Sequence, residues 1–348
     1  ALSPWVEDVT QEDQIVKRRL LVGLASAAAI LGSSIVSAEE IVARMSYHWA
    51  PKHPSAIHAK AFAETVNERL AGKFKIELYP AGQLFGIREV MGAIASGAVE
   101  LGGVVGIVSF PSINKNYSVA VFPGYFNDFA QQRKFFETDP VGNKVWSNIL
   151  ERTRSMVIAY NPVGPFAVYS TAEKLDTVES LQGLKARVLT KPDRARWKGL
   201  GVGKMVSMPT REVYTSLQNG TIDTISTVPS ALKAYSWWEY LKSGQLPYIG
   251  FADSYIMANK PWFDGLSDEI KKVLMEEGVK TGKASTDSIL AASDQMHKEF
   301  VERGGVLTVL EGAELAKLRQ IETEKVEPAL AEQVDADVFA ALKKFVGR

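Results

Sequence analysis

Residues 181–223 constrain the fold more than any other part of this 348-residue chain. Residues 184–189 alternate between apolar and polar side chains and include branched ones, which is typical of a half-buried strand. A helix is predicted to begin near Asp193, directly after a proline, and a second helix is predicted over residues 210–220, where Thr210 is a favourable N-cap. Residues 221–226 are predicted as another strand. Strands that alternate with helices form mostly parallel sheets, so this segment predicts an α/β fold.

Arg187 lies inside the first of these predicted strands. In open α/β sheets, ligands bind in the crevice at the carboxyl ends of the strands. The planar guanidinium group can bind a carboxylate through two parallel charge-assisted hydrogen bonds. Arg187 is therefore a candidate ligand-binding residue, although the local pattern is equally compatible with an ion-paired arginine at a domain edge.

The same alternation occurs in the N-terminal part of the chain. Strands are predicted at residues 42–47, 74–79 and 101–109, with helices at 54–70 and 87–95 between them. Two copies of one α/β plan predict two lobes with a cleft between them.

A long helix is predicted from Leu266 to Arg303, with Ser267 as its N-cap. Such a helix is about 55 Å long at a rise of 1.5 Å per residue, which exceeds the size of one domain. Gly278 and Gly282 are unfavourable inside a helix and leave open two shorter antiparallel helices.

The composition excludes several classes of function. Forty basic and forty acidic side chains balance, so the charge gives no reason to expect nucleic-acid binding. The absence of cysteine excludes disulfides, thiol nucleophiles, thiolate metal sites and a cysteine-linked lipid anchor. His48, His53 and His58 are separated by prolines and share no helical face, so we predict no metal site and no cofactor.

Residues 1–38 resemble an export signal preceded by a long leader. Three basic residues at 17–19 precede an apolar run over residues 20–36, and Val36 and Ala38 are small enough for the cleavage site. The run is short for a membrane span, so we predict cleavage after Ala38 rather than a membrane anchor.

Several motifs of the chain resemble the periplasmic solute-binding proteins of tripartite ATP-independent periplasmic (TRAP) transporters. The resemblance covers approximately residues 41–345. It rests on the GLKAR strand at 183–187, the run at 209–223, YPAGQL at 79–84 with RE at 88–89, SGAVE at 96–100 and FPGYF at 122–126.

The resemblance implies a two-lobed periplasmic binding protein fold of the α/β class, with a ligand cleft between the lobes and a long C-terminal helix spanning both. Lobe I is expected to comprise residues 41–164 plus 253–292, and lobe II residues 165–252 plus 293–348. The protein is expected to be a periplasmic monomer that binds a small organic acid and delivers it to TRAP membrane permease subunits.

The resemblance also assigns Arg187 as the residue that clamps the substrate carboxylate. Phe166 stands where members that bind acidic sugars carry a second arginine. Thr227 stands at a position that is often asparagine, and Val105 lies near one that can carry a carboxylate. These three departures lower the polarity of the pocket, so we expect a monocarboxylate with a hydrophobic or aromatic body rather than a sugar acid.

Other residues are weaker candidates for the pocket. His48 and Trp49 follow the first strand, where the family places ligand contacts, and Tyr125 and Phe251 are further candidate walls. Trp237 and its neighbour Trp238 are interpreted as packing residues. The basic group at 191, 194 and 196 is interpreted as a solvated helix start.

Two other classes of protein are possible. A binding protein of an ABC-type importer would share the two-lobed shape. A two-domain α/β enzyme is disfavoured because the chain has no Walker loop, no G-x-S-x-G elbow and no H-E-x-x-H motif. The glycines at 102, 103 and 106 fall within a predicted strand rather than at a strand-to-helix turn.

Overall fold

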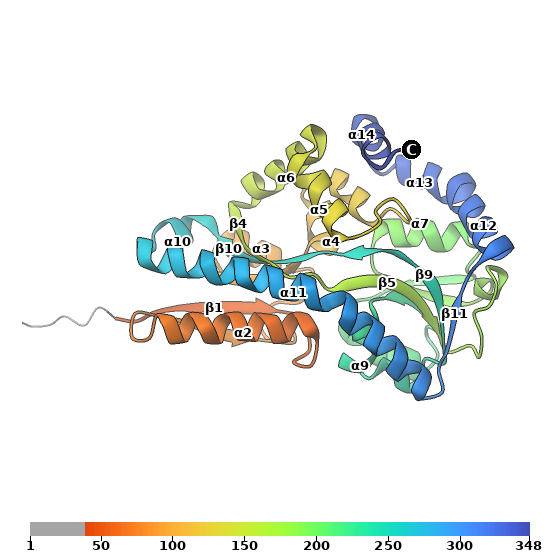
Figure 1. Cartoon of the computed structure of the whole chain (residues 1–348), viewed down its shortest axis with the longest axis horizontal. Coiled ribbons are helices and arrows are strands. Elements are labelled where there is room, and N and C mark those ends of the chain that lie inside the picture. The colour runs from red at the N-terminus through yellow and green to blue at the C-terminus, as the bar shows by residue number, and fades with distance from the viewer. Residues whose placement is uncertain (1–38) are drawn as a thin grey trace, which may run out of the picture. The chain divides into compact units, whose positions relative to one another are not determined.

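The computed structural model describes residues 39–348, so the predicted signal and leader lie outside the described residues. Residues 40–348 form one compact unit. This unit is built around two β-sheets with helices packed on them (Figure 1). No helix within residues 39–348 combines the length and the apolar character that a membrane span requires.

The first sheet has five strands in the order β2-β1-β3-β10-β4. Its strands are β1 (Ile41–Tyr47), β2 (Phe74–Tyr79), β3 (Leu101–Val105), β4 (Ser155–Tyr160) and β10 (Ser254–Asn259). Strand β1 pairs in parallel with β2 and β3, whereas β10 is antiparallel to both of its neighbours. Strand β3 is buried along its whole length, in agreement with its apolar sequence.

The second sheet has six strands in the order β11-β9-β5-β8-β6-β7. Its strands are β5 (Gly164–Ser170), β6 (Lys185–Val188), β7 (Lys204–Ser207), β8 (Thr224–Thr227), β9 (Ser243–Ala252) and β11 (Val306–Val309). Strand β6, which carries Arg187, pairs in parallel with β7 and β8, as its sequence context predicts.

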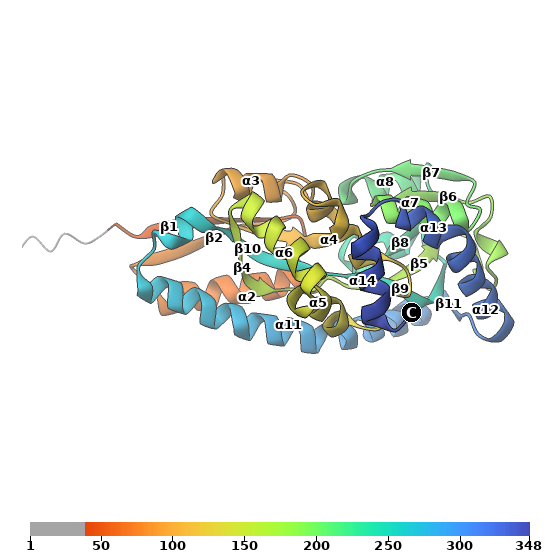
Figure 2. The same ribbon diagram turned by 90° about the horizontal axis from the view of Figure 1, so that it is seen from above.

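The helices connect and cover these strands (Figure 2). Before the second sheet, the chain forms α2 (Pro54–Arg69), α3 (Val90–Ser96), α4 (Gly106–Ser109), α5 (Phe129–Thr138) and α6 (Pro140–Thr153). It continues with α7 (Lys191–Gly199), α8 (Val213–Gln218), α9 (Pro229–Ala234), α10 (Lys260–Asp264) and α11 (Asp268–Glu302). It ends with α12 (Gly312–Ile321), α13 (Glu327–Ala331) and α14 (Ala336–Val346).

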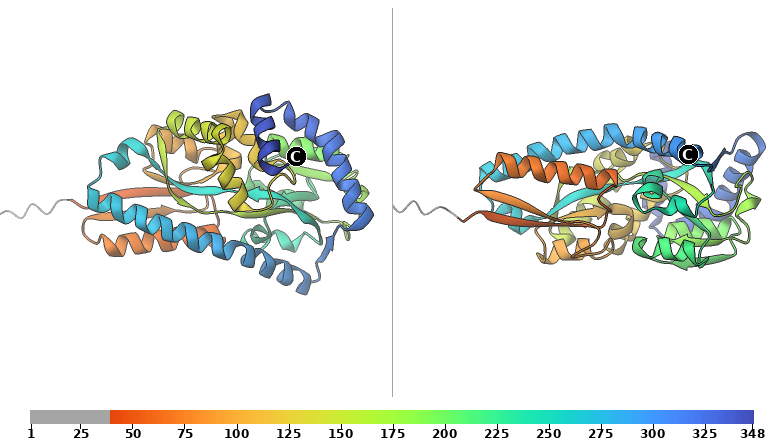
Figure 3. Two further views of the ribbon diagram at one scale, coloured as in Figure 1. Left: turned by 45° about the horizontal axis from the view of Figure 1, so that its top comes forward. Right: turned by 90° about the horizontal axis from the view of Figure 1, so that it is seen from below.

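The predicted long helix is confirmed as the single helix α11, and the alternative of two shorter helices is wrong. Ser267 caps it by accepting a hydrogen bond from the backbone N–H of Ile270. Helix α11 packs on α2 and β4 beside the first sheet and on α9, β5 and β11 beside the second (Figure 3). Gly278 lies against β4, where an added Cβ atom would be 2.0 Å from the carbonyl oxygen of Ile158. Close packing therefore explains why a glycine interrupts the helical sequence.

Two local predictions need correction. The apolar run at 101–109 is a strand only as far as Val105 and then turns into helix α4, because a continuous apolar run does not distinguish a buried strand from a buried helix. Thr210 does not cap a helix with its side chain. Its hydroxyl oxygen accepts a hydrogen bond from Arg187 instead.

We propose that lobe I comprises residues 41–164 plus 253–292 and lobe II residues 165–252 plus 293–348. The membership of the two sheets supports these boundaries, since the chain changes sheet between β4 and β5 and again between β9 and β10. The last helix, α14, contacts α6, which belongs to the part of the chain before β5. Between these parts of the chain, Asp335 forms an exposed ion pair with Lys115 at 2.7 Å.

Candidate ligand-binding site

A pocket lies between β3, α4 and the loop after β1 on one side and the second sheet with the segment around α9 on the other. We name it the Arg187 pocket. Its walls are His48, Trp49, His53, Ile87, Val105, Ile107, Val163, Phe166, Arg187, Leu189, Thr210, Thr227, Val228, Ala231, Tyr235, Trp237 and Ala252. Six of the eight predicted site residues are therefore brought together here: Arg187, Phe166, Thr227, Trp49, His48 and Val105.

The Arg187 side chain is the cationic centre of this pocket, and it is only 3% exposed. Its Nε donates to the carbonyl oxygen of Met208 and its Nη2 donates to Oγ1 of Thr210, both at 3.3 Å. These acceptors are neutral, and no carboxylate of the described residues forms an ion pair with Arg187. Burial lowers the pKa of Arg187 to about 10, while Asp193 opposes this shift, so the group stays charged at neutral pH.

A buried charge without a counter-ion is expensive, so this arrangement favours binding an anion. The pocket offers no competitor for that anion, since no Asp or Glu lines it within the described part of the chain. The carboxylate of a ligand can therefore supply the missing negative charge and accept hydrogen bonds from the remaining guanidinium N–H groups.

Aromatic rings of the segment that follows α9 support Arg187. Its guanidinium carbon lies 5.9 Å from the centre of the Trp237 ring, near enough for a cation–π attraction. Tyr235 stacks on Trp237 with 5.0 Å between the ring centres. Trp237 thus lines the pocket, and its interpretation as a packing residue alone was incomplete.

Two polar groups of the loop that follows β1 also border the pocket. Trp49 is fully buried because Gly103 of the neighbouring strand leaves room for its ring. Trp49 Nε1 and His48 Nδ1 are buried without a hydrogen-bond partner among the described residues. Burial lowers the pKa of His48 to about 3, and the positive charges of His53 and Arg187 act in the same direction. His48 is therefore neutral at physiological pH.

His53 links the two sides of the pocket. Its Nδ1 accepts a hydrogen bond from the Ser55 N–H at 3.2 Å and so caps α2, while its Nε2 lies 3.1 Å from Ser230 Oγ at the start of α9. The side chain is 1% exposed, and burial lowers its pKa to about 3. His58, the third member of the histidine series, bonds Ser288 on α11 instead, so the three rings do not converge.

A pH dependence of stability follows from His53. Below pH 6.5 this histidine takes up a proton in the unfolded chain, but in the folded protein it does so only near pH 3. Stability is therefore lost as the pH falls through that window. We expect His53→Asn to keep the N-cap acceptor and to reduce this loss by up to about 1.4 kcal/mol per pH unit. Urea unfolding of both proteins between pH 7 and pH 4.5 measures the difference, and equal slopes would contradict it.

Two predicted site residues lie outside the pocket. Phe251 is on β9, where side chains alternate between the faces of the sheet, and it packs on Phe129 with 4.9 Å between ring centres. Tyr125 lines a different cavity near the C-terminal helices, and the Arg348 guanidinium lies 4.4 Å from its ring centre. Neither residue is a wall of the Arg187 pocket.

Sequence reasoning also missed several residues near this site. His53, Tyr235 and Thr210 line the pocket, and no local pattern singles them out because their neighbours there are distant in sequence. Arg196 is not part of a solvated helix start, since it is 2% exposed and its Nε lies 3.5 Å from a carboxylate oxygen of Glu322. Lys191 and Arg194 of the same group are exposed as predicted.

Two α/β halves with a pocket between them and one long helix packed on both have the two-lobed fold of solved solute-binding proteins. Residues 45–333 match the family of bacterial extracellular solute-binding proteins, family 7, known as DctP. The chain therefore belongs to the DctP-type solute-binding proteins of TRAP transporters.

Curated relatives in this family bind different acids. The chain is 26% identical over 335 residues to the C4-dicarboxylate-binding periplasmic protein DctP of Rhodobacter capsulatus, covering 94% of this chain and 98% of the relative. It is also 26% identical over 268 residues to the 2,3-diketo-L-gulonate-binding periplasmic protein YiaO of Escherichia coli, covering 77% and 79%.

Solved structures share the fold at lower identity. DctP7 of Bordetella pertussis, an extracytoplasmic solute receptor binding pyroglutamic acid, superposes with a TM-score of 0.78 at 18% identity, covering 88% of this chain and 99% of that one. The sugar-acid-binding protein DctPAm of Advenella mimigardefordensis, solved with galactonate, has a TM-score of 0.80 at 20% identity, covering 89% and 98%. These likenesses establish the fold. The ligand of this chain has to be inferred from the residues of its own pocket.

Proposed function

We propose that this protein is a monomeric periplasmic receptor that captures a small monocarboxylate through Arg187 and delivers it to a TRAP membrane permease. The observation that carries the proposal is the buried guanidinium group of Arg187, which lacks a carboxylate partner among the described residues. Family membership supports the permease as partner, and the curated relatives named above are periplasmic. Such a receptor needs no catalysis. To reach the periplasm, it needs the export signal predicted at residues 1–38.

The body of the ligand is proposed to be hydrophobic or aromatic. Arg187 is the one Lys or Arg among the described walls of the pocket, so a second carboxylate would find no cation there. The other walls include apolar and aromatic groups, with Phe166, Val105 and Trp49 among them. Burial of an apolar body against these side chains contributes about 25 cal/mol per Å².

Closure of the lobes around the ligand is proposed as the binding mechanism. Hydrogen bonds already join elements of the two proposed lobes, since Arg88 Nη2 donates to the carbonyl oxygen of Leu189 at 3.1 Å. The His53–Ser230 contact is a second such link. A ligand that contacts both sides adds to these links and shifts the population toward the closed form.

A thermal-shift panel on the chain from Glu39 tests the proposed specificity. Phenylacetate and 3-methylbutanoate are expected to raise the melting temperature, whereas succinate and galactonate are not. A ligand at one hundred times its Kd stabilises the folded state by about 2.7 kcal/mol. Stabilisation by succinate or galactonate alone would reject the hydrophobic monocarboxylate and retain an acid receptor. Stabilisation by none of the four acids would reject the proposed substrate class.

A further inference from the structure

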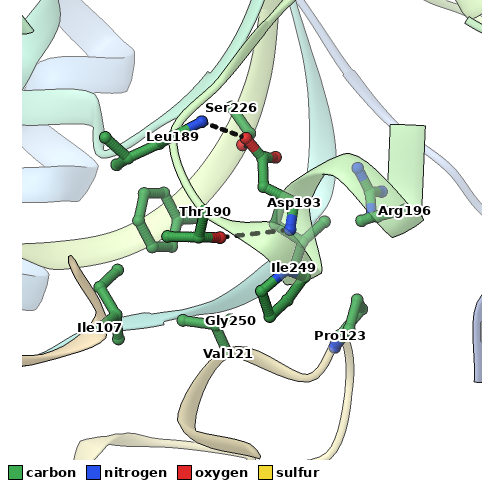
Figure 4. A pocket seen from close by; sticks show the side chains of 12 residues that line it. Ile107, Val121, Pro123, Leu189, Thr190, Asp193, Arg196, Ser226, Ile249 and Gly250 are labelled. Atoms are coloured by element: carbon green, nitrogen blue, oxygen red, sulfur yellow. Dashed lines mark hydrogen bonds between the residues drawn. The ribbon is translucent and has the colours of Figure 1, made fainter. Parts of the chain in front are cut away.

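A second cavity opens beside the Arg187 pocket. The two cavities share Ile107, Phe166 and Leu189 as walls, so they are neighbouring parts of one cleft. The second cavity, which we name the annex, has an empty volume of about 420 Å³. Figure 4 shows Asp193 and Thr190 on one side of it and Ile107 and Pro123 on the other.

Most charged and polar groups of the annex are engaged with the protein itself. The Asp193 carboxylate accepts hydrogen bonds from the Leu189 N–H at 2.9 Å and from Ser226 Oγ at 2.8 Å. Thr190 Oγ1 accepts from the Asp193 N–H at 3.2 Å. Arg196 faces Glu322, as described above, but its Nη1 is buried without a hydrogen-bond partner among the described residues. The annex differs from the Arg187 pocket because its arginine faces a carboxylate, and most of its remaining walls are apolar.

Gly250 explains why the annex is open. It lies on β9 directly opposite Phe166 of β5, and paired residues on neighbouring strands point to the same face of a sheet. A Cβ atom added at Gly250 would meet no heavy atom within 4 Å, and its backbone is not in the left-handed region. Neither a close approach nor a special φ thus requires glycine here, although glycine weakens a strand. The missing side chain leaves space next to Phe166.

We propose that the annex receives the distal part of the ligand and that Gly250 determines how long this ligand can be. The substrate is then an extended monocarboxylate, with its carboxylate on Arg187 and an apolar body that passes Phe166 to reach Gly250. This inference rests on the proposed function, because the clamp at Arg187 determines which end of the ligand enters the annex.

Calorimetry with a length series tests the inference. The probes are phenylacetate, 3-phenylpropanoate, 4-phenylbutanoate and 5-phenylpentanoate, which share one ring and one carboxylate. In the unmodified protein the affinity is expected to rise at least tenfold along the series. Gly250→Leu, which fills the annex, is expected to abolish this rise while changing the affinity for phenylacetate less than threefold. Gly250→Ala is expected to give a smaller loss for the longest acids.

Gly92→Leu is the matched control, since Gly92 lies exposed on α3, lines neither cavity and has no atom within 4 Å of an added Cβ. It is expected to bind the series as the unmodified protein does. Affinities that do not rise with ligand length, or that respond equally to both leucine variants, overturn the proposed role of the annex. They leave the proposed carboxylate binding by Arg187 unaffected. Binding that survives Arg187→Ala, or no binding of any acid, refutes the proposed function and the annex with it.

Discussion

Arg187→Met is expected to weaken the binding of 4-phenylbutanoate by a hundredfold or more. A carboxylate accepts two charge-assisted hydrogen bonds from the guanidinium group, each worth about 1.5–3 kcal/mol, and about 1.4 kcal/mol corresponds to a factor of ten. Arg187→Lys keeps the charge but loses the bidentate geometry, so an intermediate affinity is expected. Calorimetry on the three proteins gives the dissociation constants, and a loss below tenfold for the methionine variant would remove Arg187 from the site.

The same substitution is expected to leave the stability of the unliganded protein unchanged or to raise it. Arg187 is buried with neutral acceptors only, so methionine removes the cost of a desolvated charge and fills a similar volume. Urea unfolding without ligand separates this effect from binding. Arg194→Met is the control, because this exposed arginine lies on α7 and lines a cavity other than the Arg187 pocket. Its replacement is expected to change affinity and stability little.

Gly278→Ala is expected to destabilise the fold by up to about 2 kcal/mol. Alanine is better than glycine in a helix by about 1 kcal/mol, but the added Cβ atom would lie 2.0 Å from the Ile158 carbonyl oxygen. Overpacking of a core costs about 1–3 kcal/mol and occasionally more, so the clash decides the sign. The backbone of β4 and of α11 has to move apart to relieve it.

Gly282→Ala, one turn further along α11, provides the comparison. Its added Cβ atom would lie 3.4 Å from the Tyr160 carbonyl oxygen, an ordinary contact. We expect its free energy of unfolding to be equal to or above that of the unmodified protein. Urea unfolding of both variants at pH 7.5 measures the contrast. Equal stabilities for the two would show that α11 is less tightly packed on β4 than its geometry indicates.

The fold was predictable from sequence because its signals are local. Alternating strands, the Ser267 cap and the helical run of α11 are each indicated by residues close together in the chain. The placement of Arg187 on a parallel strand was predictable for the same reason. The end of β3 was not, since apolar residues at 101–109 suit a buried helix as well as a buried strand.

The walls of the pocket were only partly predictable. Motif positions led to Phe166, Thr227 and Val105, which the structure places together, while their roles toward a ligand stay a prediction. Tyr235 and His53 lie 182 positions apart in the numbering and meet only through folding, with 6.4 Å between their ring centres. Arg196 is buried by Glu322 from a distant helix, and no pattern near residue 196 encodes that partner.

The way the chain passes between its sheets has a consequence for how new specificities can arise. The first sheet takes β10 from a part of the chain that follows most of the second sheet, and α11 is shared by both. Neither proposed lobe is thus a continuous piece of the chain, so exchanging one lobe for that of a relative would require cutting several packed elements. Single substitutions in the cleft avoid such cuts. We expect those at positions 166 and 250, which are paired on the neighbouring strands β5 and β9, to act most directly.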